Sequence, residues 1–167
     1  MPSSSAARAS SRALRETPMS QPATRQGGCL CGAVRYEVRG RLRQIVVCHC
    51  GQCRRWTGHV VAATRTRREN LTILQDATLA WFESSPGVWR GFCRECGSSL
   101  FWTQPGGERV SIMAGSLDDP RGLRIAAHAS VADKAPYEDL ADDLPHVKGV
   151  GADAVLAPED LEEEPPG

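Results

Sequence analysis

The chain has 167 residues, 41% of them hydrophobic and 24% charged, and its formal net charge is zero. This length suits one domain with a modest core, and no stretch approaches the roughly 20 apolar residues that span a bilayer, which excludes an integral membrane protein. No apolar segment follows the N-terminus, so we expect a cytoplasmic protein whose thiols stay reduced. Seven cysteines, an odd number, argue against a closed disulfide framework and favour metal binding.

Charge is distributed unevenly along the chain. Residues 26–132 contain fourteen arginines and eight acidic residues, whereas residues 133–167 contain two lysines and eleven acidic residues. The basic middle region either binds a small anionic ligand or is neutralised by the acidic end of the same chain. An aromatic content of 5% and the lack of a Lys/Arg run disfavour nucleic-acid binding.

Composition predicts three regions. Residues 1–25 are rich in Ser, Ala, Arg and Pro without an apolar period, so we expect a disordered extension. Their Arg- and Ser-rich start is similar to an organelle transit peptide, but Met19 is the preferred natural start. The last ten residues, 158–167, are acidic and Pro-rich and are expected to be a solvated tail after the folded middle region.

The central region is predicted to consist of short strands. Alternating or apolar runs lie at residues 34–38, 45–47, 59–64, 71–74 and 125–131. Two hairpins are expected, one joining residues 79–83 to 88–92 and one joining residues 99–102 to 109–114, because Pro and Gly punctuate both connections. Only residues 137–144 have a helical pattern. The pattern predicts an all-β domain, mainly antiparallel, whose small core is supplemented by metal.

The cysteines fall into three groups with short spacings. The groups are Cys29 and Cys31; Cys48, Cys50 and Cys53; and Cys93 and Cys96. Each group is flanked by glycine, which permits the tight turns that bring sulfur ligands together around one ion. Three such groups, which use every cysteine of the chain, predict metal sites far more specifically than one isolated pair.

Counting ligands suggests how the groups combine. The first and third groups supply four thiolates, a complete tetrahedral set for a structural zinc ion that clamps distant segments. The middle group, Cys48, Cys50 and Cys53, supplies only three. Three protein ligands with one open position are typical of a catalytic zinc, so these three cysteines are the candidate catalytic residues.

Histidine provides the alternative fourth ligand. His49 lies between two cysteines, but on an extended segment its side chain would face away from theirs, so we interpret it as a packing residue. His59 and His128 could also reach the site. His128 lies on the polar phase of its strand and is expected to be solvated, and His146 is expected at the surface.

Four arginines lie beside the cysteines. Arg54 and Arg55 follow Cys53, and Arg90 and Arg94 flank Cys93. Their guanidinium groups would offset thiolate charge or bind a substrate carboxylate, and ordinary surface charge is the alternative.

These motifs resemble the glutathione-dependent formaldehyde-activating enzyme family, also described by its kinship to centromere protein V. The resemblance rests on residues 28–36 (GCLCGAVRY), 48–53 (CHCGQC) and 92–97 (FCRECG), and continues with residues 114–120, His128, residues 134–137 and residues 143–145. It covers about residues 26–147 and implies a zinc-binding domain with these bounds, so that residues 148–167 are expected to be an acidic disordered tail. Tyr137 departs from the tryptophan expected in many members.

The resemblance implies an Mss4-like fold of curved antiparallel sheets with two zinc ions. It assigns a structural zinc to Cys29, Cys31, Cys93 and Cys96 and a second zinc to Cys48, Cys50 and Cys53. The implied activity is that of a carbon–sulfur lyase that condenses glutathione with formaldehyde, so the expected partners are a small thiol and an aldehyde. The alternatives are a related thiol enzyme that uses another aldehyde and a non-catalytic zinc module that binds a protein or an anionic partner.

Overall fold

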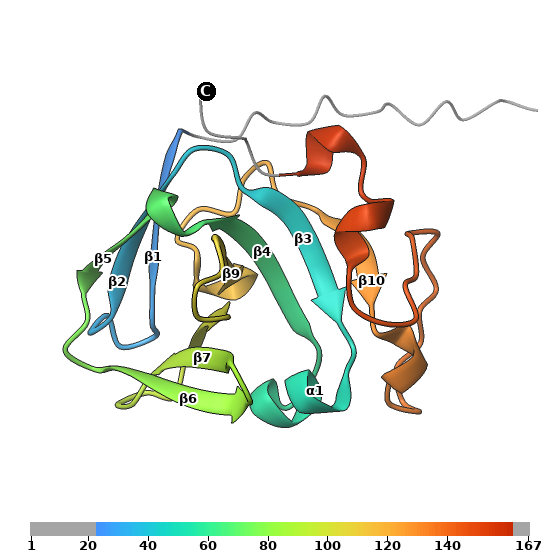
Figure 1. Ribbon diagram of the computed structural model, residues 1–167, viewed down its shortest axis with the longest axis horizontal. Coiled ribbons are helices and arrows are strands. Elements are labelled where there is room, and N and C mark those ends of the chain that lie inside the picture. Colours follow the sequence, from blue (N-terminus) through green and yellow to red (C-terminus); the bar gives the residue numbers. More distant parts are fainter. Residues whose placement is uncertain (1–22, 162–167) are drawn as a thin grey trace, which may run out of the picture.

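The computed structural model describes residues 23–161 and consists mainly of two β-sheets (Figure 1). The smaller sheet is antiparallel, with strand order β1-β2-β5. Its strands are β1 (Thr24–Gly28), β2 (Arg35–Arg39) and β5 (Leu71–Gln75). Thr24 and Arg25, which the sequence assigned to the N-terminal extension, therefore belong to β1, and Arg25 is buried. Residues 1–22 of that extension lie outside the described residues.

The larger sheet has the strand order β10-β3-β4-β9-β8-β7-β6. These strands are β3 (Arg43–Cys48), β4 (Val61–Arg67), β6 (Leu79–Ser85), β7 (Val88–Cys93), β8 (Ser99–Thr103), β9 (Arg109–Met113) and β10 (Ile125–Ala129). All neighbours are antiparallel except β10 and β3, which run parallel. The all-β prediction and both hairpins, β6–β7 and β8–β9, are confirmed.

The main core lies between the two sheets. Tyr36 and Val38 of β2 pack with Leu100 and Phe101 of β8 and Ile112 of β9, all of them fully buried. The rings of Tyr36 and Phe101 meet edge to face with centroids 5.1 Å apart. In β2 and β9 the alternation of apolar and polar residues produces this arrangement, because successive side chains of a strand point to opposite faces.

Helix α1 (Gly51–Thr57) was not predicted, and the predicted helix over residues 137–144 is wrong. Seven residues are too few to show a helical period. The ends of α1 are nevertheless marked, because the Cys50 sulfur accepts a hydrogen bond from the Cys53 N–H and Gly58 ends the helix with φ 84°. In residues 137–144, by contrast, Glu138 is drawn into the interior to contact His49.

The segment after residue 147 packs on β10 and β3, although the sequence assigned it to a tail. Residues Ala152–Val155 and Pro158–Asp160 form 3-10 turns beside β10 (Figure 1). Ala152 is buried against Val46 and Ala129. The Asp153 carboxylate accepts hydrogen bonds from both Arg43, at 2.8 Å, and Arg65. Asp160 pairs with Arg124 at 2.7 Å. Residues 162–167 lie outside the described residues.

Among the described residues, no helix combines the length and the apolar character that a membrane crossing requires.

The ion pairs of Asp153 predict a stabilising role for this segment. Asp153→Asn removes the negative charge between Arg43 and Arg65, so we expect a loss of about 1–2 kcal/mol in the free energy of unfolding at neutral pH, discounted for the partial exposure of the carboxylate. Chemical denaturation monitored by circular dichroism measures this loss. Glu159→Gln, at an exposed position of the same segment, is the matched control. Equal midpoints for the two variants would show that the Asp153 ion pairs do not stabilise the fold.

Candidate metal centres

Cys29, Cys31, Cys93 and Cys96 converge at one end of the domain. Their sulfur atoms all lie within 4.8 Å of one another. The Cys29 and Cys31 sulfurs are 3.4 Å apart, and those of Cys31 and Cys93 are 3.8 Å apart. Four sulfurs bound tetrahedrally at 2.3 Å from a zinc ion would be about 3.8 Å apart. The cluster therefore has the donor type, the number and the spacing for a closed metal site.

Two glycine turns shape this cluster. Cys29 follows β1 and Cys93 ends β7, and each begins a turn whose glycine has a left-handed backbone: Gly32 with φ 80° and Gly97 with φ 74°. The Gly32 N–H donates to the Cys29 carbonyl at 3.1 Å, and the Gly97 N–H donates to the Cys93 carbonyl at 2.8 Å. A side chain with a Cβ would strain both turns, so glycine is required where the chain wraps around the sulfurs.

Hydrogen-bond donors support negative charge on the sulfurs of the four-cysteine cluster. The Val34 N–H donates to the Cys29 sulfur at 3.2 Å. The Thr78 hydroxyl, 3.3 Å from the Cys93 sulfur, lowers the pKa of that thiol. The Ser98 hydroxyl, 3.2 Å from the Cys96 sulfur, lowers the pKa of Cys96 to about 5. Because thiolates rather than thiols ligate metals, these contacts prepare the cluster for a cation.

Cys48, Cys50 and Cys53 form a second cluster around the start of α1. Cys48 ends β3, Cys50 caps the helix and Cys53 lies in its first turn, and the three sulfurs lie within 4.8 Å of one another. A hydrogen bond from Cys53 lowers the pKa of Cys48 to about 5, and the same contact raises the pKa of Cys53. One thiol of the cluster therefore ionises readily, and its negative charge makes the other thiols harder to ionise. A cation is needed to hold three negative sulfurs together.

Arg90 is the arginine that reaches this three-cysteine cluster. It is only 2% exposed, and one guanidinium nitrogen lies 3.8 Å from the Cys53 sulfur and 2.8 Å from the Gln52 side-chain oxygen. Its Nε–H donates to the Ser84 hydroxyl at 3.1 Å, and the guanidinium lies over the Trp56 ring. A buried positive charge held so firmly offsets the negative charge of the thiolates.

The other three arginines singled out by the sequence do not meet the sulfurs in the described contacts. Arg55 is exposed, and Arg94 donates to the Ala77 carbonyl at 2.8 Å. Arg54 is half-buried on α1.

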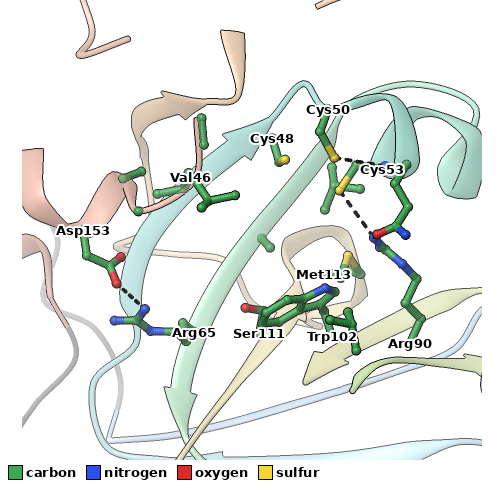
Figure 2. A pocket seen from close by; sticks show the side chains of 18 of the residues that line it. Val46, Cys48, Cys50, Cys53, Arg65, Arg90, Trp102, Ser111, Met113 and Asp153 are labelled. Carbon is green, nitrogen blue, oxygen red and sulfur yellow. Dashed lines mark hydrogen bonds and ion pairs between the residues drawn. The ribbon is translucent and has the colours of Figure 1, made fainter. Parts of the chain in front are cut away.

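A pocket of about 350 Å³ opens beside the three-cysteine cluster. Figure 2 shows Cys48, Cys50 and Cys53 at one end, with Arg90 beside Cys53, and the Arg65–Asp153 ion pair at the other end. The walls between the two ends are mainly apolar and include Val46, Val61, Ala63, Trp102, Met113, Ala129 and Ala152. This size falls within the range of about 300–1,000 Å³ for small-molecule sites. The three sulfurs thus line one end of a mainly apolar pocket.

The histidines lie outside both cysteine clusters. His49 is buried, and its ring contacts Glu138 and His128 rather than the adjacent sulfurs. The prediction of a solvated His128 is wrong, because the chain around residues 145–149 pairs with β10 and leaves His128 only 5% exposed. His59 and His146 are both exposed.

Sequence reasoning missed Glu138, Asp142 and Asp153. No spacing signal connects Glu138 with His49 or Asp153 with Arg43, because these contacts join distant parts of the chain. The four-residue spacing of Asp142 and His146 was the one local signal, and it did not indicate the contact of Asp142 with His128.

Comparison with known proteins places this geometry in a family. A family model described as "Glutathione-dependent formaldehyde-activating enzyme" matches residues 24–133, which include all seven cysteines. The chain belongs to the glutathione-dependent formaldehyde-activating enzyme family. A Schizosaccharomyces pombe protein named as an uncharacterised lyase is 24% identical over 119 residues, covering 70% of this chain and 85% of that protein. The crystal structure of a Rhodobacter sphaeroides protein has a TM-score of 0.49 and 23% identity, covering 72% of this chain and 98% of that chain.

The four-cysteine cluster of this formaldehyde-activating enzyme family member predicts a severe folding defect for Cys96→Ser. Structural zinc sites contribute about 10–16 kcal/mol, which is comparable to the whole stability of a small domain. We expect the variant to lose the tightly held metal of this cluster and to be insoluble or strongly destabilised. Elemental analysis and thermal unfolding measure both effects. Glu95→Gln, an exposed change in the same turn, is the control, and a Cys96→Ser protein that melts like this control would contradict a structural role for the cluster.

Proposed function

We propose that this protein is a zinc-dependent carbon–sulfur lyase that condenses glutathione with formaldehyde to S-hydroxymethylglutathione. Family membership and the lyase name of the relative support chemistry of this class. One observation carries the proposal: the cluster with only three cysteines lines the end of a pocket large enough for a small molecule. A metal site that only stabilises the fold does not need such a pocket beside an incomplete ligand set.

The proposal assigns one zinc ion to each cluster. Cys29, Cys31, Cys93 and Cys96 form a closed structural site, whereas Cys48, Cys50 and Cys53 leave one position for substrate. The donor set fits, because clustered thiolates select zinc or iron over hard cations. When bound to the three cysteines, zinc would lower the pKa of a thiol at the open position and keep it ionised at neutral pH.

The reaction requires an ionised thiol and an aldehyde held close together. The glutathione sulfur forms a bond to the formaldehyde carbon, the carbonyl electron pair moves to oxygen, and the proton lost by the thiol ends on that oxygen. No atom leaves, so the addition balances without an oxidant or a reductant. Arg90 holds positive charge beside the sulfurs, and Trp102 and Met113 keep water away from the reacting carbon. Holding both reactants in one pocket supplies proximity.

The far end of the pocket suits a substrate that bears carboxylates. Arg43 and Arg65 both line it, and Asp153 contributes one negative charge between them. Guanidinium groups bind carboxylates in a bidentate manner, so this end of the pocket has the type of donor that a substrate carboxylate would use. Glutathione has a thiol on a chain that ends in carboxylates, so its sulfur and one carboxylate match the two ends of the pocket.

Cys53→Ser should separate chemistry from folding. The substitution removes one of three local ligands and leaves the four-cysteine cluster intact, so we expect about one tightly held zinc per chain and a near-normal circular dichroism spectrum. We expect the catalysed exchange between glutathione and formaldehyde to fall to the uncatalysed rate. Exchange spectroscopy by NMR measures this rate directly.

Arg55→Ala, an exposed substitution on the same helix, is the matched control and should keep the parent rate. A parent protein that does not exceed the uncatalysed background would overturn the assignment of this substrate pair. Activity of the parent with other thiols or aldehydes would then identify a related thiol enzyme, and inactivity with all of them would favour a binding module. A Cys53→Ser variant that matches an active parent would remove the three-cysteine cluster from the reaction.

A further inference from the structure

A third group of potential metal ligands lies beside β10, away from the cysteine sulfurs. His128, Asp142 and His146 place their ligand atoms within 4.8 Å of one another. The His128 Nε2 atom is 3.0 Å from one Asp142 carboxylate oxygen, and the His146 Nε2 atom is 3.5 Å from the other. Nitrogen and oxygen ligands at about 2.0–2.2 Å from a divalent ion lie about 3.0–3.5 Å from one another. The spacing of the cluster thus matches a shared ion.

The three side chains are held in place by the backbone. The His128 N–H donates to the Pro145 carbonyl at 2.9 Å, and the Val147 N–H donates to the His128 carbonyl at 2.8 Å. These bonds pair His128 with His146 as an isolated β-bridge, and the two rings stand at 89° to one another. The Leu144 N–H fixes the Asp142 carboxylate at 3.1 Å. The ligands are therefore positioned before any ion binds, which lowers the cost of binding.

A chain of contacts links His128 to the interior through its second ring nitrogen. His128 Nδ1 lies 2.8 Å from His49 Nε2, and His49 Nδ1 contacts Glu138. Glu138 also accepts from the Ala135 N–H at 3.2 Å. These contacts fix the orientation of the His128 ring, so that its Nε2 atom points to Asp142.

The 3.0 Å contact between His128 Nε2 and Asp142 requires either a proton or a metal ion between the two atoms. A proton would satisfy only the pair formed by His128 and Asp142. A metal ion would satisfy both of these groups and His146 as well. The contact from His128 Nδ1 to His49, and from there to Glu138, has the arrangement that commonly orients a metal-bound histidine through its second nitrogen.

We propose that His128, Asp142 and His146 form a third metal site that binds a divalent first-row transition ion such as Zn²⁺ or Co²⁺. Two imidazoles and one carboxylate favour these ions over Mg²⁺ or Ca²⁺, which prefer oxygen ligands. The site is partly exposed and lacks thiolates, so it binds its ion more weakly than the cysteine clusters do. The bound ion fastens residues 142–146 to β10.

A Co²⁺ titration tests this site in the untagged full chain, because an affinity tag of histidines would bind the probe. The protein is first dialysed against metal-free buffer so that only tightly held metal remains, and Co²⁺ is then added. We expect one additional equivalent per chain, with the weak visible absorption of nitrogen and oxygen ligation. Exchange of Co²⁺ into a cysteine cluster would instead produce sulfur-to-cobalt charge-transfer bands in the near ultraviolet.

Asp142→Asn and His146→Ala should each abolish the additional equivalent, while the tightly held metal content and the circular dichroism spectrum stay unchanged. Both positions are exposed, so neither change threatens the core. The matched controls are Asp143→Asn, the adjacent exposed acid, and His59→Ala, the other exposed histidine, and both should retain the additional equivalent. The proposal is overturned if the parent takes up no additional Co²⁺ or if Asp142→Asn and His146→Ala bind as much as the controls. Neither result depends on the enzyme activity.

Discussion

Close approach of sulfur atoms that carry like charge is the constraint on which this small domain depends. Seven thiols meet in two clusters, and thiolates at such distances repel one another unless a cation lies between them. In the four-cysteine cluster, Cys31 and Cys93 approach to 3.8 Å although 62 positions separate them. The cluster therefore joins the turn after β1, in the small sheet, to the end of β7, in the large sheet. Under the proposed structural role of this cluster, metal binding and the packing of the two sheets are one folding event.

The three-cysteine cluster also brings thiols close together, but it differs from the four-cysteine cluster in its position in the fold. Its ligands come from one short segment, so it joins no distant strands, and its sulfurs are left at the end of an apolar pocket. Arg90 is buried beside these sulfurs and is held in place by Gln52 and Ser84. Its guanidinium group therefore supplies a fixed positive charge next to the thiolates. At the opposite end, Asp153 from the C-terminal segment completes the wall between Arg43 and Arg65. The segment beyond the family match thus contributes to the pocket.

The features that could be predicted from the sequence are those encoded locally. Cysteine spacing with adjacent glycines indicated both clusters, and alternating strands with Pro-Gly turns indicated the hairpins. Helix α1 could not be predicted, because seven residues show no period and its cap is a cysteine. His128 was expected in solvent because alternation assumes one open face, whereas the His49 and His146 rings pack against the His128 ring and residues 145–149 pair with the edge of β10. The places of Glu138 and Asp153 depend on contacts between distant segments, which no local pattern encodes. Asp142 lies four residues before His146, but its contact with His128 requires the chain to return to β10.

The central claim is that one cysteine cluster is closed and the other has a position open to a thiol. Cadmium-113 NMR of protein in which Cd²⁺ replaces the tightly held metal tests this most directly, because each cluster gives its own resonance and the shift reports the number of sulfur ligands. We expect two resonances in the chemical-shift range of thiolate ligands. When glutathione is added, only the resonance of the Cys48, Cys50 and Cys53 cluster should move, toward the chemical shift of a four-sulfur site. Two resonances that both stay in place on addition of glutathione would contradict the central claim.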